Sequence, residues 1–308
     1  KKVYKARSLT TFLIAMSQKI KNFNSQAKML AIFIVGLLVG GLATYGLLGY
    51  SSKQQTQSYE QQTQSHEQQL QSYVDKIKAR GKLIVGTSAD WPPFEYVDAN
   101  HNYAGIDIEI AKRIAQELGV SLEIKDMKFA GLIEALKNGD VDIVIADMTP
   151  TAEREKVVDF SIPYYTSKGY AVVTLQSANI KSEQDLYGKK IGVQLGTIQE
   201  EWANNNLKGK AEVKSYDRVY PEMVWALQRG DIDAMILGDK IADALITKEP
   251  SLKIATYVSI PTIGGAVAVP QGAEDLKYVV NSVIEKLIDS GEMQQIFNNE
   301  IAKWLGSS

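Results

Sequence analysis

A run of 22 residues without a charged side chain, MLAIFIVGLLVGGLATYGLLGY at 29–50, divides the chain into two unlike parts. At about 1.5 Å of rise per residue, a helix of this length just crosses a hydrocarbon core of about 30 Å. Residues 1–28 carry seven Lys and Arg and no Asp or Glu, and only Lys53 lies close behind the run. This asymmetry predicts a transmembrane helix over 29–50, a basic cytoplasmic segment over 1–28 and an extracytoplasmic chain from residue 51 onward.

A cleaved signal peptide is the competing interpretation of the same run. The apolar region of a signal peptide is shorter, about 7–15 residues, and ends in a small-x-small cleavage site. The run here is longer, and ATYG at 43–46 is a poor cleavage site. We therefore expect an uncleaved, single-pass anchor in the cell membrane. The chain contains no cysteine, which excludes disulfides, a thiol nucleophile and a lipid anchor on a cysteine.

A glutamine-rich heptad repeat, QQTQSYEQQTQSHEQQLQSYV at 54–74, follows the apolar run. Spacings of three and four residues, as in a coiled-coil seam, separate Thr56, Tyr59, Thr63, His66, Leu70 and Tyr73. Threonine and histidine make a poor seam, so we predict that residues 51–73 form a polar tether, with a short coiled coil as the alternative. His66 has no partner in sequence, and no metal role is predicted for it.

Short apolar strands alternate with amphipathic helices from residue 74 onward. The segment KLIVGTSAD (82–90) begins with a strand, GIDIEIAKRIAQELG (105–119) places apolar side chains on one helical face, and DIVIAD (142–147) is again a strand. Alternation of this kind predicts an α/β fold with a mainly parallel sheet.

The α/β pattern occurs twice. EALKNGDVDIVIAD (134–147) and WALQRGDIDAMILGD (225–239) both give a helix, a Gly-Asp turn, an apolar strand and a terminal Asp. KLIVGTS (82–88) similarly echoes KKIGVQLGT (189–197). Two lobes of one plan follow, and ligands of open α/β sheets bind at the carboxyl ends of the strands. Two such edges facing each other predict a cleft.

The stretch ADMTPTAEREKVVDFSIPYY (146–165) contains the strongest candidate for a binding site. A strand ends at Asp147, and Thr149 and Arg154 follow where we expect a new helix to begin. Threonine before a helix often only satisfies free N–H groups. Arginine is unusual there because the helix dipole favours negative charge. A guanidinium beside such N–H groups is well suited to bind a carboxylate.

Catalytic patterns are scarce. The chain has two histidines, and it contains neither a GxxxxGK[ST] nor a GxGxxG phosphate loop. We therefore expect a protein that is not an enzyme, without cofactor or metal. The formal net charge of −2 argues against a nucleic-acid partner. Trp91, in a proline-stiffened loop, and Phe129, at a helix start, are aromatic candidates, although such side chains are more often part of a core.

The globular part resembles the polar amino-acid substrate-binding proteins of bacterial and archaeal ABC importers. The resemblance runs across residues 80–305 and rests on VGTSADWPPFEY, YAGIDIEIAKRIAQELG, KFAGLIEALKNGDVDIVIADMTPTAEREKVVDFSIPYY, GKKIGVQLGT and GDIDAMILGD. It implies a periplasmic-binding-protein-like clamp of type II. One lobe would comprise 74–168 and 264–308 and the other 169–263, with hinge strands near 169–174 and 264–269.

The resemblance also implies roles for individual residues. Arg154 would hold the α-carboxylate of an amino acid, helped by Thr149 and by the backbone N–H groups of Thr197 and Ile198. Asp239 would hold the α-ammonium group. Because these groups come from both lobes, closure of the lobes would complete the site.

The ligand side chain would lie between Trp91 and Phe129, and three positions around it depart from the family pattern. Ser88 stands where members that bind basic amino acids or glutamine commonly carry an aspartate. Asp147 stands where glycine or serine is usual, and Gln194 occupies a position that often reaches the side chain. These departures leave the choice among polar amino acids, basic or glutamine-like, open.

The resemblance implies the permease and ATPase subunits of an ABC importer as partners, and a membrane tether would keep the binding domain near them. Two alternatives stay open. A sensory module would need a cytoplasmic output domain, for which 28 residues are too few. An enzyme on the same scaffold, such as a dehydratase or a transglycosylase, would need a buried acid facing the substrate, and Asp147 is the candidate.

Overall fold

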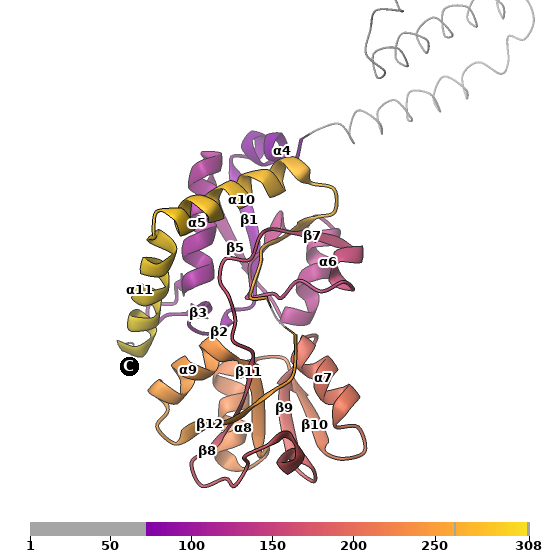
Figure 1. Cartoon of the computed structure of the whole chain (residues 1–308). Coiled ribbons are helices and arrows are strands. Elements are labelled where there is room, and N and C mark those ends of the chain that lie inside the picture. The colour runs from indigo at the N-terminus through magenta and orange to yellow at the C-terminus, as the bar shows by residue number, and fades with distance from the viewer. Residues whose placement is uncertain (1–71, 262, 307–308) are drawn as a thin grey trace, which may run out of the picture. The chain divides into compact units, whose positions relative to one another are not determined.

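The computed structural model describes residues 72–261 and 263–306 (Figure 1). The predicted cytoplasmic segment, the predicted transmembrane helix and nearly all of the predicted tether lie outside the described residues. Within the described ranges, no helix has both the length and the apolar character that a membrane span requires.

Lobe 1 is built around a five-stranded sheet in the order β5-β1-β6-β13-β7. Its strands are β1 (Lys82–Thr87), β5 (Ser121–Asp126), β6 (Ile143–Val144), β7 (Val158–Phe160) and β13 (Ala268–Pro270). Its helices are α4 (Tyr73–Arg80), α5 (Ile106–Leu118), α6 (Leu132–Lys137), α10 (Glu274–Asp289) and α11 (Glu292–Gly306), with the 3-10 turns η1 (Phe129–Gly131) and η2 (Arg154–Lys156). A small sheet is formed by β2 (Asp90–Trp91), β3 (Glu95–Val97) and β4 (Tyr103–Ala104).

Lobe 2 repeats the plan with a sheet in the order β10-β9-β11-β8-β12. Its strands are β8 (Tyr170–Leu175), β9 (Lys190–Gln194), β10 (Glu212–Tyr216), β11 (Ala234–Gly238) and β12 (Leu252–Val258). Its helices are α7 (Ile198–Asn206), α8 (Val224–Arg229) and α9 (Asp239–Lys248), with the helical turns η3 (Glu183–Leu186) and η4 (Val219–Met223). The two echoing sequence pairs occupy matching places, because β1 and β9 are second and β6 and β11 third in their sheets.

Helices cover both faces of each sheet, because successive side chains of a strand point to opposite faces. In β1, Leu83 and Val85 pack in the core that holds α5 and α10, whereas Ile84 packs with α6 on the other face. In lobe 2, Ile191 and Val193 of β9 share a core with α7, and the opposite face of the sheet packs on α8 and α9. Apolar side chains on both faces explain why the strands are almost continuously hydrophobic.

The sequence predicts mainly parallel sheets, and this prediction is wrong for about half of the strand pairs in each sheet. β5, β1 and β6 are parallel in lobe 1, as are β10, β9 and β11 in lobe 2. All pairings of β7, β8, β12 and β13 are antiparallel. Two parallel neighbours must be joined by a crossover, usually a helix. These four strands instead carry the chain into or out of a lobe, so no such crossover joins them to the strands beside them.

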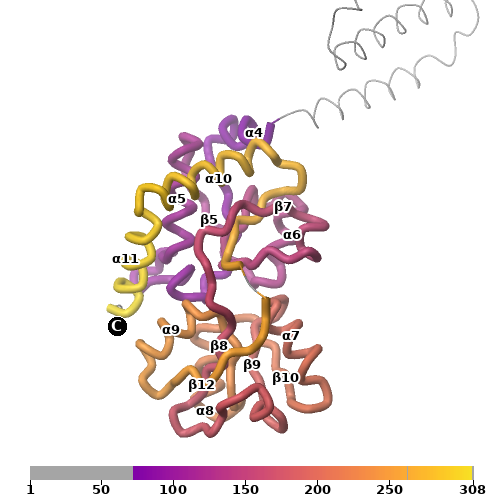
Figure 2. The backbone as a smooth tube through the Cα atoms, viewed as in Figure 1, coloured from indigo at the N-terminus to yellow at the C-terminus, as the bar shows by residue number. Residues whose placement is uncertain are grey.

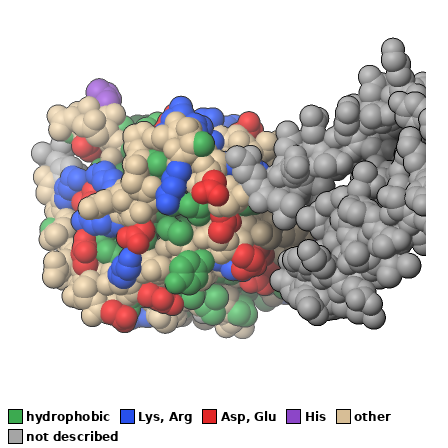
Figure 3. Space-filling model, turned by 90° about the horizontal axis from the view of Figure 1, so that it is seen from above, with side chains coloured by type: hydrophobic (Ala, Val, Ile, Leu, Met, Phe, Trp, Pro, Cys, Tyr) green, Lys and Arg blue, Asp and Glu red, His purple; other side chains and the backbone are tan. Residues whose placement is uncertain are grey.

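The chain passes twice between the lobes, from β7 to β8 through residues 161–169 and from β12 to β13 through residues 259–267 (Figure 2). The two predicted lobe boundaries, after residue 168 and after residue 263, fall within these segments. On the face of lobe 1 seen in Figure 3, Lys and Arg side chains are interspersed with Asp and Glu and do not gather in one basic patch.

Candidate functional site

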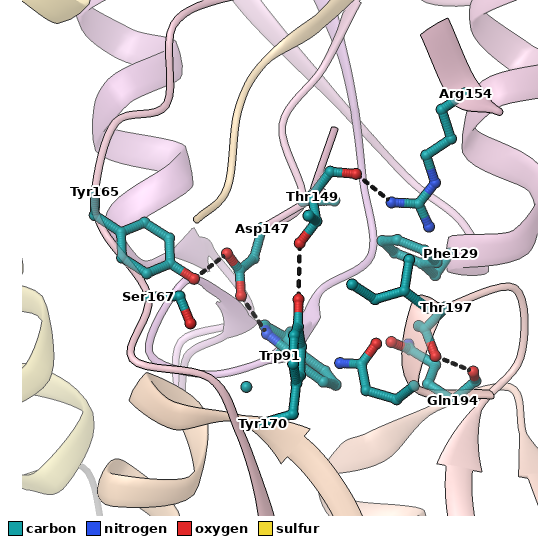
Figure 4. Close-up of a pocket in the computed structure, with 14 residues that line it drawn as sticks. Trp91, Phe129, Asp147, Thr149, Arg154, Tyr165, Ser167, Tyr170, Gln194 and Thr197 are labelled. Atoms are coloured by element: carbon teal, nitrogen blue, oxygen red, sulfur yellow. Dashed lines mark hydrogen bonds between the residues drawn. The ribbon is translucent and has the colours of Figure 1, made fainter. Parts of the chain in front are cut away.

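A cavity lies between the lobes, where loops follow the carboxyl ends of β1, β6, β9 and β11 (Figure 4). The empty space between its walls is about 390 Å³, with the open solvent at its mouth included. Its walls consist of Trp91, Phe129, Ala146, Asp147, Thr149, Arg154, Tyr165, Ser167, Tyr170, Gln194, Thr197, Ile198, Gln199 and Gly238. Eight of the ten predicted site residues are among them, and Ser88 and Asp239 are not.

Arg154 lies on one side of the cavity. Its Nη1 donates a hydrogen bond to the Thr149 carbonyl at 2.7 Å, and its Nη2 donates to the Gly196 carbonyl of lobe 2 at 3.1 Å. Its guanidinium carbon is 5.4 Å from the centre of the Phe129 ring. Burial lowers the pKa of Arg154 to about 10, so the side chain stays charged at neutral pH. Within the described chain, no carboxylate oxygen lies within 4.0 Å of this guanidinium.

The helix that the sequence predicts at Arg154 is only the three-residue 3-10 turn η2. A regular helix has no room to form, because β7 begins at Val158, two residues after the turn ends. The Oγ1 of Thr151 accepts a hydrogen bond from the Arg154 N–H at 3.2 Å, but Thr151 lies before Glu153, the N-cap of the turn. The arginine is therefore positioned by its own carbonyl contacts and not by a helix end.

Lobe 2 meets Arg154 with the loop that precedes α7. Gly196 has φ +81°, and a Cβ there would lie 3.0 Å from Ala130 of lobe 1, so glycine allows this close approach. Thr197 caps α7, since its Oγ1 accepts from the Glu200 N–H at 3.2 Å. Ile198 is the first residue of α7, where helix N–H groups lack partners within the helix. These N–H groups and the guanidinium approach the cavity from different lobes.

Asp147 lies on the other side of the cavity, with Thr149 between it and Arg154 (Figure 4). Its two carboxylate oxygens accept hydrogen bonds from the Trp91 indole N–H at 2.9 Å and from the Tyr165 hydroxyl at 2.7 Å. Its φ of 44° is in the left-handed region, which for a non-glycine residue costs about 1–3 kcal/mol and is typical of functional sites. Burial, and then the nearby Asp107, raise the pKa of Asp147 well above its usual value.

Two further acids are buried behind Asp147. Asp107 accepts hydrogen bonds from the Asp147 N–H at 2.8 Å and from the Tyr164 hydroxyl at 3.2 Å. Glu95 is fully buried, and neither of its oxygens accepts from a donor in the described chain. Burial, and then Asp107, raise the pKa of Glu95 well above its usual value, and burial raises that of Asp107 to about 6. A raised pKa favours the neutral form of Glu95, which is the form that can donate a hydrogen bond to Asp107.

The two predicted residues outside the cavity wall have partners within the protein. Asp239, fully buried at the start of α9, accepts from the Ser167 hydroxyl at 2.8 Å and from the Lys168 N–H at 3.2 Å. These donors turn its carboxylate toward the segment between the lobes. Ser88 donates to Asp90 at 2.5 Å. The ligand roles of Asp239 and Ser88 stay predictions.

Six wall residues were not among the predicted ones: Ala146, Tyr165, Ser167, Tyr170, Gln199 and Gly238. Tyr165 and Ser167 lie in the first segment between the lobes, and Tyr170 begins β8. The Tyr170 hydroxyl lies 2.9 Å from the Thr149 Oγ1. Nothing periodic marks Tyr165 and Ser167, because their segment is neither helix nor strand; only its passage across the cleft brings them to the cavity. The sole sequence signal is the density of hydroxyl groups in PYYTSKGY (163–170).

Comparison with known proteins agrees with this architecture. The arginine-binding extracellular protein ArtP of Bacillus subtilis (strain 168) is 38% identical over 218 residues, which cover 70% of this chain and 84% of ArtP. The L-cystine-binding protein TcyJ of Escherichia coli (strain K12) is 34% identical over 235 residues, which cover 76% of this chain and 86% of TcyJ.

A solved structure with the same fold is the amino acid ABC transporter substrate-binding protein AbpA from Streptococcus pneumoniae, bound to L-arginine. It matches with a TM-score of 0.71 at 34% identity, over 75% of this chain and 99% of AbpA. The two-lobe α/β fold is thus that of the periplasmic binding proteins. Residues 83–307 match the family of bacterial extracellular solute-binding proteins, family 3. The chain belongs to family 3 of the bacterial extracellular solute-binding proteins.

Proposed function

We propose that this chain is the substrate-binding subunit of an ABC importer and that it holds a polar amino acid between its two lobes. Arg154 carries the proposal. Its guanidinium is partly buried in the cavity wall, and no Asp or Glu of the described chain lies within 4.0 Å of it. A desolvated cation with no carboxylate in contact is unfavourable. A ligand carboxylate would supply that counter-charge.

The hydrogen-bond geometry around Arg154 supports a carboxylate ligand. A guanidinium has five N–H donors, and two of them donate to the carbonyls of Thr149 and Gly196. The others suit a bidentate pair with a carboxylate, which is the strong form of this interaction. The start of α7 adds the Ile198 N–H and the positive end of a helix dipole, whereas the Thr197 N–H donates to the Gln194 carbonyl at 3.4 Å. We therefore assign the α-carboxylate to this side of the cavity.

The opposite side of the cavity suits the α-ammonium group. It offers the Asp147 carboxylate and the Ser167 hydroxyl, and Ser167 connects the cavity to the buried Asp239. An amino acid is a zwitterion, and this cavity places a cation on one wall and, on the opposite wall, a carboxyl group whose ionised form a ligand ammonium group would favour. For the ligand side chain the walls provide the Trp91 ring and the Gln194 amide.

The relatives favour a polar amino acid as the ligand class, since their names describe arginine, cystine and histidine binding. Asp147 is also the one candidate for a catalytic acid. We assign it to binding, because both of its carboxylate oxygens already accept hydrogen bonds, from Trp91 and Tyr165. The family to which the chain belongs is one of solute-binding proteins and not of enzymes.

We further propose that residues 29–50 anchor the chain in the cell membrane and that residues 51–73 tether the binding domain outside it. The support is the uncharged run, its basic N-terminal flank and the polar heptads. Such a tether raises the local concentration of the binding domain at its permease. Protease treatment of intact cells or spheroplasts tests this topology. The proposal requires that the binding domain is digested while it is still joined to a membrane-bound N-terminal fragment.

Calorimetric titration of the full chain tests the proposed ligand class. The chain would be unfolded and refolded to remove carried ligand and then titrated with each of the twenty L-amino acids. We expect binding of one or a few polar amino acids. Arg154→Met should weaken it by about 10²–10⁴-fold, since two charge-assisted hydrogen bonds of roughly 1.5–3 kcal/mol each are lost. Arg80→Met, which removes an exposed arginine far from the cavity, is the matched control. Failure of all twenty amino acids to bind would refute the proposal.

A further inference from the structure

Four consecutive residues of lobe 2, 217–220, contact lobe 1 outside the ligand cavity. Asp217 pairs with Lys128 at 2.5 Å. Arg218 binds Asp126, at the end of β5, through two parallel hydrogen bonds of 2.9 and 3.0 Å. These side chains are only partly exposed, 24% for Arg218 and 23% for Asp126. A bidentate pair of this geometry is stronger than an ordinary surface ion pair.

Asp90 of lobe 1 connects this segment to the cavity. Its carboxylate, 2% exposed, accepts from the Val219 N–H at 2.5 Å and lies 3.4 Å from the Arg218 guanidinium. The same carboxylate accepts from the Gln194 amide at 3.0 Å. Gln194 belongs to lobe 2 and lines the cavity. One buried acid of lobe 1 thus binds lobe 2 both inside and outside the ligand site.

The fourth residue of the segment, Tyr220, packs on the C-terminal helix of lobe 1. Its ring meets the Trp304 ring of α11 edge-on, with centres 4.8 Å apart. Lys248 of α9 lies 4.2 Å from the centre of the same indole and donates to the Trp304 carbonyl at 2.8 Å. Figure 1 shows the C-terminal end of α11 reaching toward α9 of lobe 2. The contact between the lobes therefore continues along one edge from β5 to α11.

We propose that residues 217–220 are a closure latch, which sets how firmly the two lobes stay together without touching the ligand. The inference rests on the proposed function, in which a ligand enters between the lobes. The walls of the cavity come from both lobes, so separation of the lobes widens the access to it. Separation breaks the contacts of Asp217, Arg218, Val219 and Tyr220.

The latch acts on affinity through the population of closed molecules. When only the closed form binds tightly, the apparent dissociation constant is the intrinsic one divided by the closed fraction. None of the four latch residues lines the cavity. Loss of the latch should therefore weaken binding of every ligand by the same factor, up to about fivefold for the partly exposed Arg218 pair.

Distance measurement between two spin labels tests the latch without any ligand. Because the chain has no cysteine, labels can be attached at Lys137→Cys in α6 and Lys208→Cys after α7, both exposed and on different lobes. In this labelled chain, Arg218→Met should move a share of the molecules to longer distances. Arg80→Met is the control, since its ion pair with Asp142 lies within lobe 1. Unchanged distances in Arg218→Met would overturn the proposal.

Asp126→Asn removes the same ion pair from the other side, so a folding defect of Arg218→Met alone would not be mistaken for loss of the latch. Circular dichroism checks that both variants are folded. Titration with L-arginine, L-lysine and L-glutamine then adds the affinity readout. Both variants should weaken the affinity for each of these amino acids that binds by the same factor. A loss confined to one of them would make Arg218 a ligand contact and overturn the latch. If no amino acid binds the parent chain, the proposed function fails, and the label distances still decide the latch.

Discussion

Asp107→Asn should make the protein more stable at neutral pH, although it removes a fully buried charged group. Asp107 accepts hydrogen bonds from the Asp147 N–H and the Tyr164 hydroxyl, and its other oxygen faces Glu95. Asparagine has nearly the same shape. Its carbonyl oxygen can accept the first two bonds, and its NH₂ group can donate to Glu95. The substitution therefore removes the charge, keeps the two bonds from the Asp147 N–H and the Tyr164 hydroxyl, and reverses the direction of the contact with Glu95.

The magnitude follows from the pKa of Asp107, which burial raises from 3.8 to about 6. Below about pH 4 the Asp107 carboxyl is protonated in both the folded and the unfolded chain, so it does not change the free energy of unfolding. Between about pH 4 and 6 the folded protein binds more protons than the unfolded chain, so stability falls as the pH rises. Above pH 6 Asp107 is ionised in both states, and burial of its charge destabilises the folded protein by the full amount. A shift of about two units corresponds to roughly 3 kcal/mol, and Asp107→Asn should recover up to that amount at pH 8.

Urea unfolding of the full chain at pH 4 and pH 8 measures this effect. The free energy of unfolding of Asp107→Asn should exceed that of the wild type at pH 8 and match it at pH 4. Asp289→Asn, at an exposed position of α10, is the control and should change stability by less than about 0.5 kcal/mol. A destabilised Asp107→Asn at pH 8, or an equal gain at both pH values, would refute the reasoning.

Three further predictions concern the cavity and its support. Arg154→Lys keeps the charge and loses the bidentate geometry, so calorimetry should show at least about tenfold weaker amino-acid binding. Gly265→Ala should lower the free energy of unfolding, measured by urea titration, by about 1–3 kcal/mol, since its Cβ would lie 2.6 Å from Asp147 Oδ1. Gly131→Ala is the control, because there is open space around Gly131, and it should leave the free energy of unfolding unchanged. Trp91→Phe keeps an aromatic ring and removes the hydrogen bond to Asp147, so ligand affinity should fall about two- to tenfold.

The fold was predictable where the signal is local. The helix predicted over 105–119 is observed as α5 (Ile106–Leu118), because apolar spacing alone specifies its buried face. The strand predicted over 142–147 shortens to β6 (Ile143–Val144). The chain turns away from the sheet there and reaches a left-handed conformation at Asp147, which no hydrophobic pattern encodes. The antiparallel strands were missed because strand direction depends on how the chain passes between the lobes.

The candidate site was predictable in part for the same reason. Arg154 and Thr149 stand in one loop, and a short stretch of sequence was enough to identify them. Asp90, the buried acid that joins the lobes, was not among the predicted site residues. Its partner Arg218 is 128 positions away, and no local spacing relates the two. Contacts between the lobes depend on tertiary packing, so the latch emerges only from the folded chain.

The pairing of Arg154 with a ligand α-carboxylate is the central claim, and a thermodynamic cycle tests it most directly. The tightest-binding amino acid and its α-carboxamide would each be titrated into the wild type and into Arg154→Met. The wild type should prefer the free acid by about 100-fold or more, and Arg154→Met should lose most of that preference. Equal affinity of the wild type for acid and amide, or an undiminished preference in Arg154→Met, would contradict the claim.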